Sequence, residues 1–363
     1  MTAVRATTLR EPEGTGSERL SGDWLTRGRD GLLTACAPAE GAVLRWTQQG
    51  AGWIGPDRLP APGLLPRLTV AQGADGYIHL VGMRRVGSGD GVELVHAVQF
   101  QTGRPLLGWD AIGHPNKDPR WTGDPAAVVD GEGRLCVALR NGGSGVSCRS
   151  QATRGGWGRW QDLGGFGVQE SLAAAVDGAG LVELFVPDQK TIARYTQEKP
   201  GAPFALADRL GVHAVPGTLS ALATVSGSVS LFFVDDDGVV QVWAPQRDPQ
   251  PRPLMKAAGT GPLHLAPAMI EGYPCTVLAQ ETGEGSEVAF AAYPAENEEA
   301  GAWWTPTSTG TATGTEGPMP IALQEHGDGG LIAVALTGDG VPMATRQKTA
   351  AGGFALGRWK PLV

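Results

Sequence analysis

The sequence predicts an all-β fold: a seven-bladed β-propeller whose blades are four-stranded antiparallel sheets. Three observations predict it. A segment that ends in Leu-Gly or a similar pair recurs seven times. A glycine turn before an apolar strand recurs at the same interval, and a segment carrying an aromatic residue or an arginine lies between them. A period of about fifty residues, built from short strands, is typical of propellers.

The clearest copy of the first segment is WQDLGG, at Trp160–Gly165. Its pattern is an apolar residue, two further positions, a second apolar residue and, in most copies, a glycine. We expect the tryptophan to cover the seam between two blades, while the glycine lets the chain cross to the next blade. The seven copies are Trp53–Pro60, Trp109–Gly113, Trp160–Gly165, Leu206–Gly211, Pro253–Gly259, Trp303–Gly310 and Trp359–Val363.

The second marker is a glycine turn, usually Asp-Gly, that precedes an apolar strand. Such turns join antiparallel strands, because glycine adopts a positive φ without steric cost. Each unit is therefore expected to consist of hairpins. The turns stand at Gly31, Gly76, Gly131, Gly178, Gly227, Gly272 and Gly329.

The third marker is an aromatic residue or an arginine late in the third strand of each unit. These positions are Trp46, Phe100, Arg149, Tyr195, Trp243, Tyr293 and Arg346. In the third unit the four predicted strands are DPAAVV, RLCVAL, GVSCRS and WGRWQDLG. No unit shows a long helical period.

The repeats divide the chain into residues 1–17, which are polar and form a tail or add to an outer edge, and one propeller at residues 18–363. The first and last units each contain four strands, so the ring is expected to close by non-covalent contact. The expected blades are 18–65, 66–117, 118–167, 168–214, 215–261, 262–315 and 316–363.

Composition excludes several classes of partner. The formal net charge is −8 and no run of Lys or Arg occurs, which argues against nucleic acid. The N-terminus lacks the apolar region of a secretory signal, and the longest apolar run, Val229–Val234, is too short to span a bilayer. No membrane insertion is expected. The location is left open between the cytoplasm and a non-classical export route.

Four cysteines do not form a disulfide framework in a chain of 363 residues. Cys136 and Cys148 flank a glycine-rich turn near Gly142, so they are expected to lie opposite each other on a hairpin. A disulfide between them is one interpretation. The favoured interpretation is that both are small, buried strand residues with free thiols.

Catalytic and metal-binding patterns are missing. His114, His213 and His264 fall near connections between blades, yet no HxH or HExxH spacing supports a metal site. The run Asp235–Asp237 lacks the further ligands of a calcium loop and is expected to be a solvated turn. There is no Walker loop, GxSxG elbow or CxxC pair. The sequence therefore predicts no cofactor, no metal and no enzyme.

Two segments combine a strand ending in a basic residue and an aromatic or polar one, a glycine turn, a tryptophan and a Leu or Leu-Gly. They read VLRWTQQGAGWIGPDRL and CRSQATRGGWGRWQDLGG. This pattern resembles the PLL-like bacterial seven-bladed propeller lectins and, more loosely, tachylectin-type propellers. The resemblance implies binding of fucose and related sugars between adjacent blades. The aromatic position varies between units here, which implies fewer than seven equivalent sites.

An aromatic ring can stack on the apolar face of a pyranose while polar neighbours bind its hydroxyls. The resemblance places such sites near the third-strand aromatics. Polar neighbours follow several of them, namely Gln48, Gln197, Gln246 and Glu296. The alternative is that these rings pack blades together. The candidate ligand-binding residues are Trp46, Trp160, Tyr195, Trp243, Tyr293 and Arg149.

Three functions are compatible with these patterns. The first is a lectin with shallow glycan sites between blades, binding fucose-like sugars by resemblance. The second is a non-catalytic scaffold that holds a protein partner on one face, as a component of a larger bacterial particle or toxin assembly. The third, an enzyme that uses the central channel, is disfavoured because no catalytic group of residues is visible.

Overall fold

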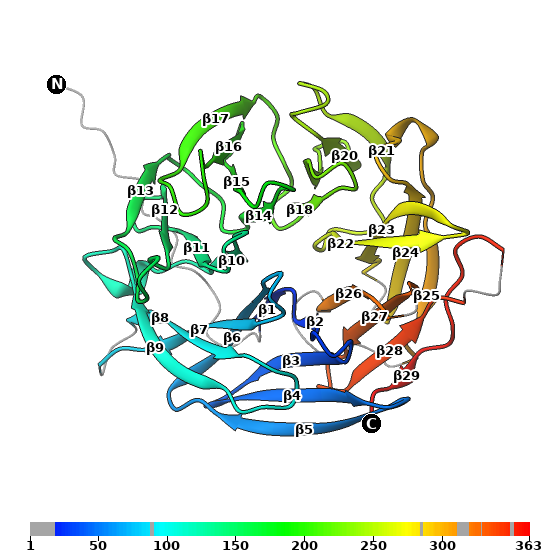
Figure 1. Cartoon of the computed structure of the whole chain (residues 1–363). Coiled ribbons are helices and arrows are strands. Elements are labelled where there is room, and N and C mark those ends of the chain that lie inside the picture. Colours follow the sequence, from blue (N-terminus) through cyan, green and yellow to red (C-terminus); the bar gives the residue numbers. More distant parts are fainter. Residues whose placement is uncertain (1–18, 88–90, 284–285, 311–318, 328, 349–351) are drawn as a thin grey trace.

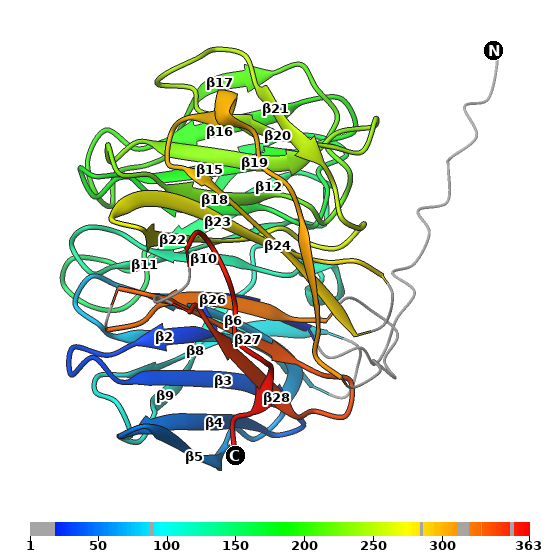
Figure 2. The same cartoon turned by 90° about the vertical axis from the view of Figure 1, so that its right-hand side faces the viewer.

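Seven antiparallel sheets stand around a central axis in the computed structural model of the chain (Figure 1). Figure 2 shows the ring from the side, with the blades lying one above another in this view. The structure describes residues 19–87, 91–283, 286–310, 319–327, 329–348 and 352–363, so the expected tail at 1–17 lies outside the described residues. The predicted seven-bladed β-propeller is confirmed. The described helical segments are two short 3-10 turns, η1 (Pro119–Trp121) and η2 (Glu298–Ala300).

Each blade is a meander in which consecutive strands pair antiparallel from the axis to the rim. Blade 1 contains β2 (Leu25–Arg27), β3 (Leu33–Ala39), β4 (Ala42–Gln49) and β5 (Gly52–Pro60). Blade 2 contains β6 (Leu64–Gln72), β7 (Ile78–Arg85), β8 (Val92–Gln99) and β9 (Leu107–Gly113). Blade 3 contains β10 (Ala126–Val129), β11 (Leu135–Arg140), β12 (Val146–Ser150) and β13 (Gln161–Gly164). Blade 4 contains β14 (Ala173–Val176), β15 (Val182–Pro187), β16 (Ile192–Thr196) and β17 (Ala205–Leu210).

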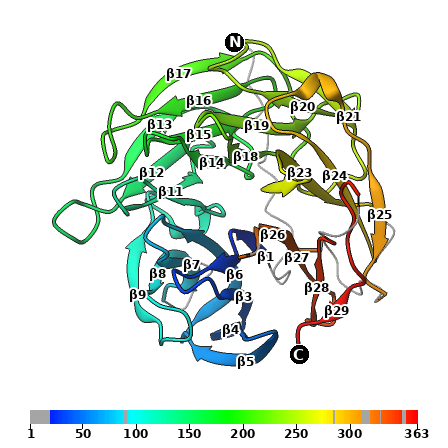
Figure 3. The same cartoon turned by 45° about the vertical axis from the view of Figure 1, so that its right-hand side comes forward.

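The remaining blades follow the same order. Blade 5 contains β18 (Ser220–Ala223), β19 (Val229–Val234), β20 (Val239–Trp243) and β21 (Arg252–Lys256). Blade 6 contains β22 (His264–Ile270), β23 (Tyr273–Glu281), β24 (Glu287–Pro294) and β25 (Thr305–Ser308). Blade 7 contains β26 (Ile321–Glu325), β27 (Leu331–Leu336), β28 (Pro342–Arg346) and β29 (Lys360–Pro361). Blade 7 meets blade 1 and completes the ring (Figure 3).

The segment β1 (Arg19–Gly22) differs from expectation. The sequence places it in the first blade, but it pairs in parallel with β6 and forms a fifth, innermost strand of blade 2. The chain then turns at Gly22, which has φ 71°. A Cβ there would lie 2.1 Å from the Val70 carbonyl oxygen, so the close approach requires glycine. Ion pairs from Arg19 to Asp124 and Glu170 add blades 3 and 4 to the contacts of this strand.

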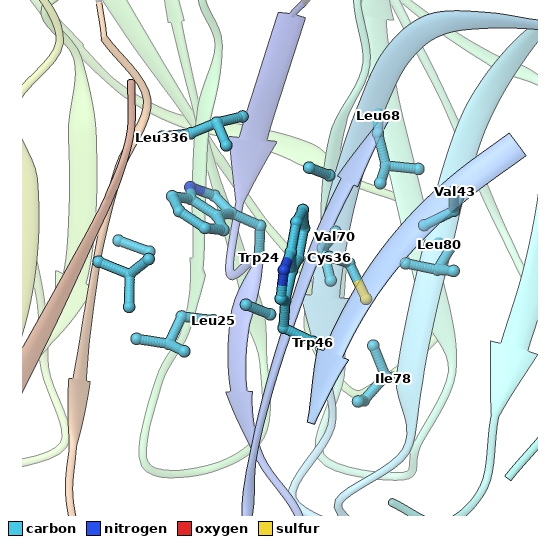
Figure 4. Packing of buried hydrophobic residues seen from close by; sticks show 14 of the residues in the cluster. Trp24, Leu25, Cys36, Val43, Trp46, Leu68, Val70, Ile78, Leu80 and Leu336 are labelled. Atoms are coloured by element: carbon cyan, nitrogen blue, oxygen red, sulfur yellow. The ribbon is translucent and has the colours of Figure 1, made fainter. Parts of the chain in front are cut away.

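The hydrophobic core consists of clusters at the seams between neighbouring blades. Separate clusters join blades 2 and 3, 3 and 4, 4 and 5, 5 and 6, and 6 and 7. One larger cluster extends from blade 7 through blade 1 to blade 2, and Trp24 and Trp46 lie within it (Figure 4). Each blade therefore buries both of its faces against its neighbours.

Glutamine side chains fasten the second strand of four blades to the third. In each case the amide oxygen accepts a hydrogen bond from the backbone N–H that opens the second strand. The bonds are Leu33 N to Gln48, 3.1 Å; Leu135 N to Gln151, 2.9 Å; Val182 N to Gln197, 3.3 Å; and Leu331 N to Gln347, 3.0 Å. The repeated glutamine is thus a structural residue of the hairpin.

The inner turns of blades 3, 4 and 5 contact one another through backbone. Gly131 N donates to the Gly180 carbonyl at 2.9 Å, and Gly178 N donates to the Gly227 carbonyl at 2.7 Å. In blades 3 and 4 the positive φ belongs to Gly133 and Gly180, not to the Gly131 and Gly178 that mark the repeat. Those two glycines serve the close approach of neighbouring turns.

All four cysteines are free and buried. The expectation that Cys136 and Cys148 lie opposite each other is wrong, because Cys136 pairs with Ser150 and Cys148 with Ala138. The turn spans Asn141–Gly145 and is centred on Gly143 instead of Gly142, so the partner of Cys136 moves by two residues, from Cys148 to Ser150. Burial raises the pKa of the Cys136 thiol to about 11, so this group is not ionised at neutral pH.

Candidate functional site

Four of the sequence-predicted ligand residues lie inside the seams. Trp46, Tyr195, Trp243 and Tyr293 expose 2%, 6%, 2% and 3% of their surface. The Trp243 ring meets Phe185 of blade 4 edge-on, with ring centres 6.0 Å apart, and the Tyr195 hydroxyl donates to the Leu163 carbonyl of blade 3 at 3.2 Å. Burial raises the pKa of the Tyr195 and Tyr293 hydroxyls. These rings pack blades together and present no free face to a sugar.

The polar neighbours of these rings are also occupied. Gln48 and Gln197 hold the hairpins described above. Gln246 donates to Glu183, and a carboxylate oxygen of Glu296 accepts the Ser226 N–H at 3.1 Å. The third-strand aromatics and their neighbours therefore form the framework of the ring.

Arg149 and Trp160, by contrast, come together in the seam between blades 2 and 3. The Arg149 guanidinium carbon lies 5.7 Å from the centre of the Trp160 ring, within the range of a cation–π contact. Its Nε donates to the Gly158 carbonyl at 2.7 Å, and a terminal nitrogen donates to the Ile112 carbonyl of blade 2. The arginine thus ties the Trp160 loop to the neighbouring blade.

The Trp160 loop is not a strand, although WGRWQDLG is predicted to be one. β13 begins only at Gln161. A turn through Gly155 and Gly156, both with positive φ, precedes it, and Gly158 N donates to the Ser150 carbonyl at 2.9 Å. The loop leaves Trp160 half-buried at the outer part of the seam.

A hollow of about 530 Å³ opens beside Trp160, and we name it the blade 2–3 groove. One wall is the connection from blade 2 to blade 3, residues 115–118 with Trp121. The other wall is the β11–β12 turn at 141–143 with Ser147, Trp160 and Asp162. The groove lies at the end of the ring that carries the β11–β12 turn.

The connection from blade 2 to blade 3 contains η1, which places Trp121 at the groove. Asp118 caps η1 by accepting the Arg120 N–H at 3.0 Å, and hydrogen bonds from Arg120 lower the pKa of Asp118. Trp121 remains 42% exposed. A Cβ on Gly142 would lie 2.8 Å from the Trp121 Cβ, so the tryptophan rests against a position that only glycine fits.

The groove also offers polar atoms. Asn116 Oδ1 accepts the Gly142 N–H at 2.7 Å, while its amide nitrogen is buried without a hydrogen-bond partner among the described residues. Asn141 Nδ2 donates to Ser147 Oγ at 3.0 Å. One oxygen of Asp162 accepts the Gly164 N–H at 2.9 Å. Two indoles beside amide and carboxylate groups are suited to a ligand that has an apolar face and several hydroxyls.

Of the residues that line this candidate groove, the sequence analysis names Trp160 but not Trp121, Asn116 or Asn141. The missed residues lie in a connection and a turn, where the repeat has no marker. One signal was available: Trp121 is a tryptophan outside every copy of the repeated segments.

The histidines do not form a metal centre among the described residues, where no group of three or more His, Cys, Asp or Glu side chains converges. His213 Nδ1 lies 2.6 Å from Asp236 Oδ1. Asp235 Oδ1 accepts the backbone N–H groups of Asp237 and Val239 at 3.0 and 2.9 Å, which makes the acidic run a closed turn. No helix in the described part of the chain is long and apolar enough to cross a bilayer.

No protein family and no curated protein matches the sequence. Solved structures of similar fold include the BP39L lectin from Burkholderia pseudomallei, with a TM-score of 0.69 and 17% identity over 94% of this chain and 98% of that one. AofleA from Arthrobotrys oligospora has a TM-score of 0.53 and 14% identity over 82% and 89% of the two chains. A fucose-specific lectin from Aleuria aurantia has a TM-score of 0.51 and 14% identity over 83% and 97%. At these identities the likeness concerns the fold.

Proposed function

We propose that this chain is a carbohydrate-binding propeller of the kind that the PLL-like resemblance implies, with a glycan site in the blade 2–3 groove. The observation that carries the proposal is the pair of indoles, Trp121 and Trp160, beside the unpartnered amide nitrogen of Asn116. The lectin names of several fold neighbours support it.

The groove chemistry suits a neutral pyranose. Trp121 offers a half-exposed indole to the C–H face of the ring, and the Asn116 amide can donate to a hydroxyl oxygen. Asp162 can accept from a hydroxyl through its second oxygen. The groove is shallow, so one site alone is expected to bind weakly, and strong attachment to a surface would need several copies.

The test is a glycan array followed by calorimetry with methyl α-L-fucoside. Trp121→Ala is expected to weaken binding about tenfold, because aromatic contacts contribute about 0.5–1.5 kcal/mol beyond area burial and the variant removes the apolar wall as well. Asn116→Ala is expected to weaken it without removing that wall. Trp303→Ala is the matched control, since Trp303 is 76% exposed and does not line the groove.

The outcomes separate clearly. A loss of affinity in Trp121→Ala and Asn116→Ala, with Trp303→Ala unchanged, supports the proposed groove. Binding to no glycan by the folded protein contradicts the carbohydrate function. Glycan binding that Trp121→Ala leaves intact contradicts the groove as its site.

A further inference from the structure

A second hollow, of about 830 Å³, lies between blades 1 and 2. We name it the blade 1–2 hollow. The β2–β3 turn at 28–30, the β6–β7 turn at 76–77 and the β8–β9 loop at 100–107 supply its walls. In an antiparallel meander these loops share one end of the ring, while the β11–β12 turn and the connections between blades share the other. The two hollows therefore open at opposite ends of the ring.

The blade 1–2 hollow contains two arginines without carboxylate partners. Arg29 and Arg104 both line it, and neither forms an ion pair among the described residues. Two arginines buried in the ring do pair with carboxylates: Arg45 with Asp57 at 2.7 Å, and Arg194 with Glu183 at 2.6 Å. Arg29 and Arg104 thus bring two positive charges to one hollow of a chain whose net charge is −8.

Asp30 is the acidic residue in the lining, and it forms no ion pair with either arginine among the described residues. Asp30 Oδ1 accepts the Leu32 N–H at 3.1 Å and the Thr102 hydroxyl at 3.0 Å. These bonds close the β2–β3 turn and join it to the β8–β9 loop. Asp30 therefore stabilises the walls of the hollow.

Contacts hold the backbone at Arg104 and the side-chain stem of Arg29. The buried Arg45 donates to the Arg104 carbonyl at 2.5 Å and to the Gly103 carbonyl at 3.4 Å, which holds the β8–β9 loop. The Arg29 side-chain stem lies over Gly76, where a Cβ would come within 2.9 Å of the Arg29 Cγ. Holding the loop and the stem reduces the conformational entropy that the two side chains lose when they bind a carboxylate.

An apolar wall completes the hollow. Tyr77 and Phe100 meet edge-to-face, with ring centres 4.7 Å apart and planes at 82°. Phe100 is 44% exposed, and Leu107 beside it is exposed as well. The hollow thus combines an aromatic face with two arginine side chains.

We propose that the blade 1–2 hollow binds a carboxylate-bearing pyranose, of the uronic or sialic acid class. Its carboxylate pairs with Arg29 and Arg104 through charge-assisted hydrogen bonds, and its ring lies against Phe100. This site is separate from the blade 2–3 groove. The molecule would then hold an acidic sugar at one end of the ring, whatever the other end binds.

The test is calorimetry of the full chain with methyl β-D-glucuronide and a methyl sialoside, against methyl β-D-glucoside. At least one acidic sugar is expected to bind at millimolar concentration, while the glucoside does not. Arg104→Gln and Arg29→Gln are each expected to weaken binding at least fivefold. Arg358→Gln, which removes an exposed arginine far along the chain in blade 7, is the matched control and should change nothing. Binding should also weaken between 50 and 500 mM NaCl.

Two results would overturn the proposal: no binding of either acidic sugar, or binding that Arg104→Gln weakens no more than Arg358→Gln does. A crossed experiment keeps the two sites distinguishable. Trp121→Ala should leave acidic-sugar binding unchanged, and Arg104→Gln should leave fucoside binding unchanged. A variant at one site that abolishes both would contradict the separate hollow.

Discussion

At the scale of single residues, Gly131 shows how tightly the inner turns are packed. Its backbone has no positive φ, so alanine meets no backbone strain there. A Cβ would nevertheless lie 2.6 Å from the Gly180 Cα of the next blade, which is a backbone atom and cannot swing aside. We expect Gly131→Ala to lower the free energy of unfolding by about 1–3 kcal/mol, measured by chemical denaturation.

The matched control for this substitution is Gly211→Ala. A Cβ on Gly211 would meet no atom within 4 Å, and its φ is also ordinary. That variant should change stability by less than about 0.5 kcal/mol. Equal effects of the two substitutions would mean that the contact between inner turns contributes nothing to stability.

The residue types of the repeat indicate the seams more directly than the lining of the candidate groove. The third-strand aromatics were correctly placed late on their strands, but whether a ring faces a seam or solvent depends on the neighbouring blade. Side chains of adjoining blades cover Trp46 and Trp243. These side chains are distant in sequence, so no local pattern reveals that the rings are buried. Trp121 was missed for the opposite reason, since its loop belongs to no repeat.

At the scale of secondary-structure elements, a buried histidine pair joins β7 to β8. His79 Nδ1 lies 3.0 Å from His96 Nε2, and Trp157 of blade 3 meets the His96 ring edge-on at 5.7 Å. Burial lowers the pKa of both His79 and His96 to about 4. The repulsion of a charged partner ring also lowers the pKa of His96, while nearby Asp110 opposes the shift.

The sign of the pH effect follows from these lowered pKa values. Between pH 6.5 and 4 the unfolded chain binds protons at both rings while the folded chain does not, so stability falls as the pH falls through this window. We expect each ring to contribute a loss on the order of 3 kcal/mol by pH 4, since one pKa unit corresponds to 1.36 kcal/mol. The measurement is the denaturation midpoint at pH 7, 5.5 and 4.5.

The matched variant is His79→Gln/His96→Gln, which keeps polar side chains but removes the titrating rings. Its stability should fall less between pH 7 and 4.5 than that of the wild type, because the two rings that take up protons on unfolding are gone. The carboxylates contribute equally to both proteins. Parallel curves for the two proteins would show that the pair does not couple protonation to unfolding.

The elements themselves were largely predictable, because each blade repeats the same hairpin chemistry and the alternation of apolar and polar residues sets its strands. The main exception is β1. Its four residues carry no repeat marker, and each pairs in parallel with a β6 residue 48 positions further along the chain, as Arg19 does with Arg67. This strand addition uses the free inner edge of β6, and no local sequence pattern pairs two segments so far apart.

At the scale of the whole molecule, the ring closes where blade 7 meets blade 1 without any exchange of strands. Trp24 is buried there beside Leu336 (Figure 4). Gln324 Nε2 donates to the Leu25 carbonyl at 3.3 Å across the same seam. Every other seam lies between blades that are consecutive in the chain. This seam alone joins blades that are linked only through the rest of the ring, so its opening is not restrained by a short connection.

This difference predicts where the ring opens first. Trp24→Ala should cost about 3–5 kcal/mol, and hydrogen exchange should accelerate mainly in β2–β4 and β26–β28. Phe233→Ala removes an equally buried ring from the seam of blades 4 and 5, where a short connection keeps the two blades together. Its loss of stability should appear as faster exchange throughout the ring. Mass spectrometry of peptide exchange in both variants distinguishes the two patterns. Uniform acceleration in Trp24→Ala would mean that the propeller unfolds as one unit, and that its non-covalent closure is as firm as its other seams.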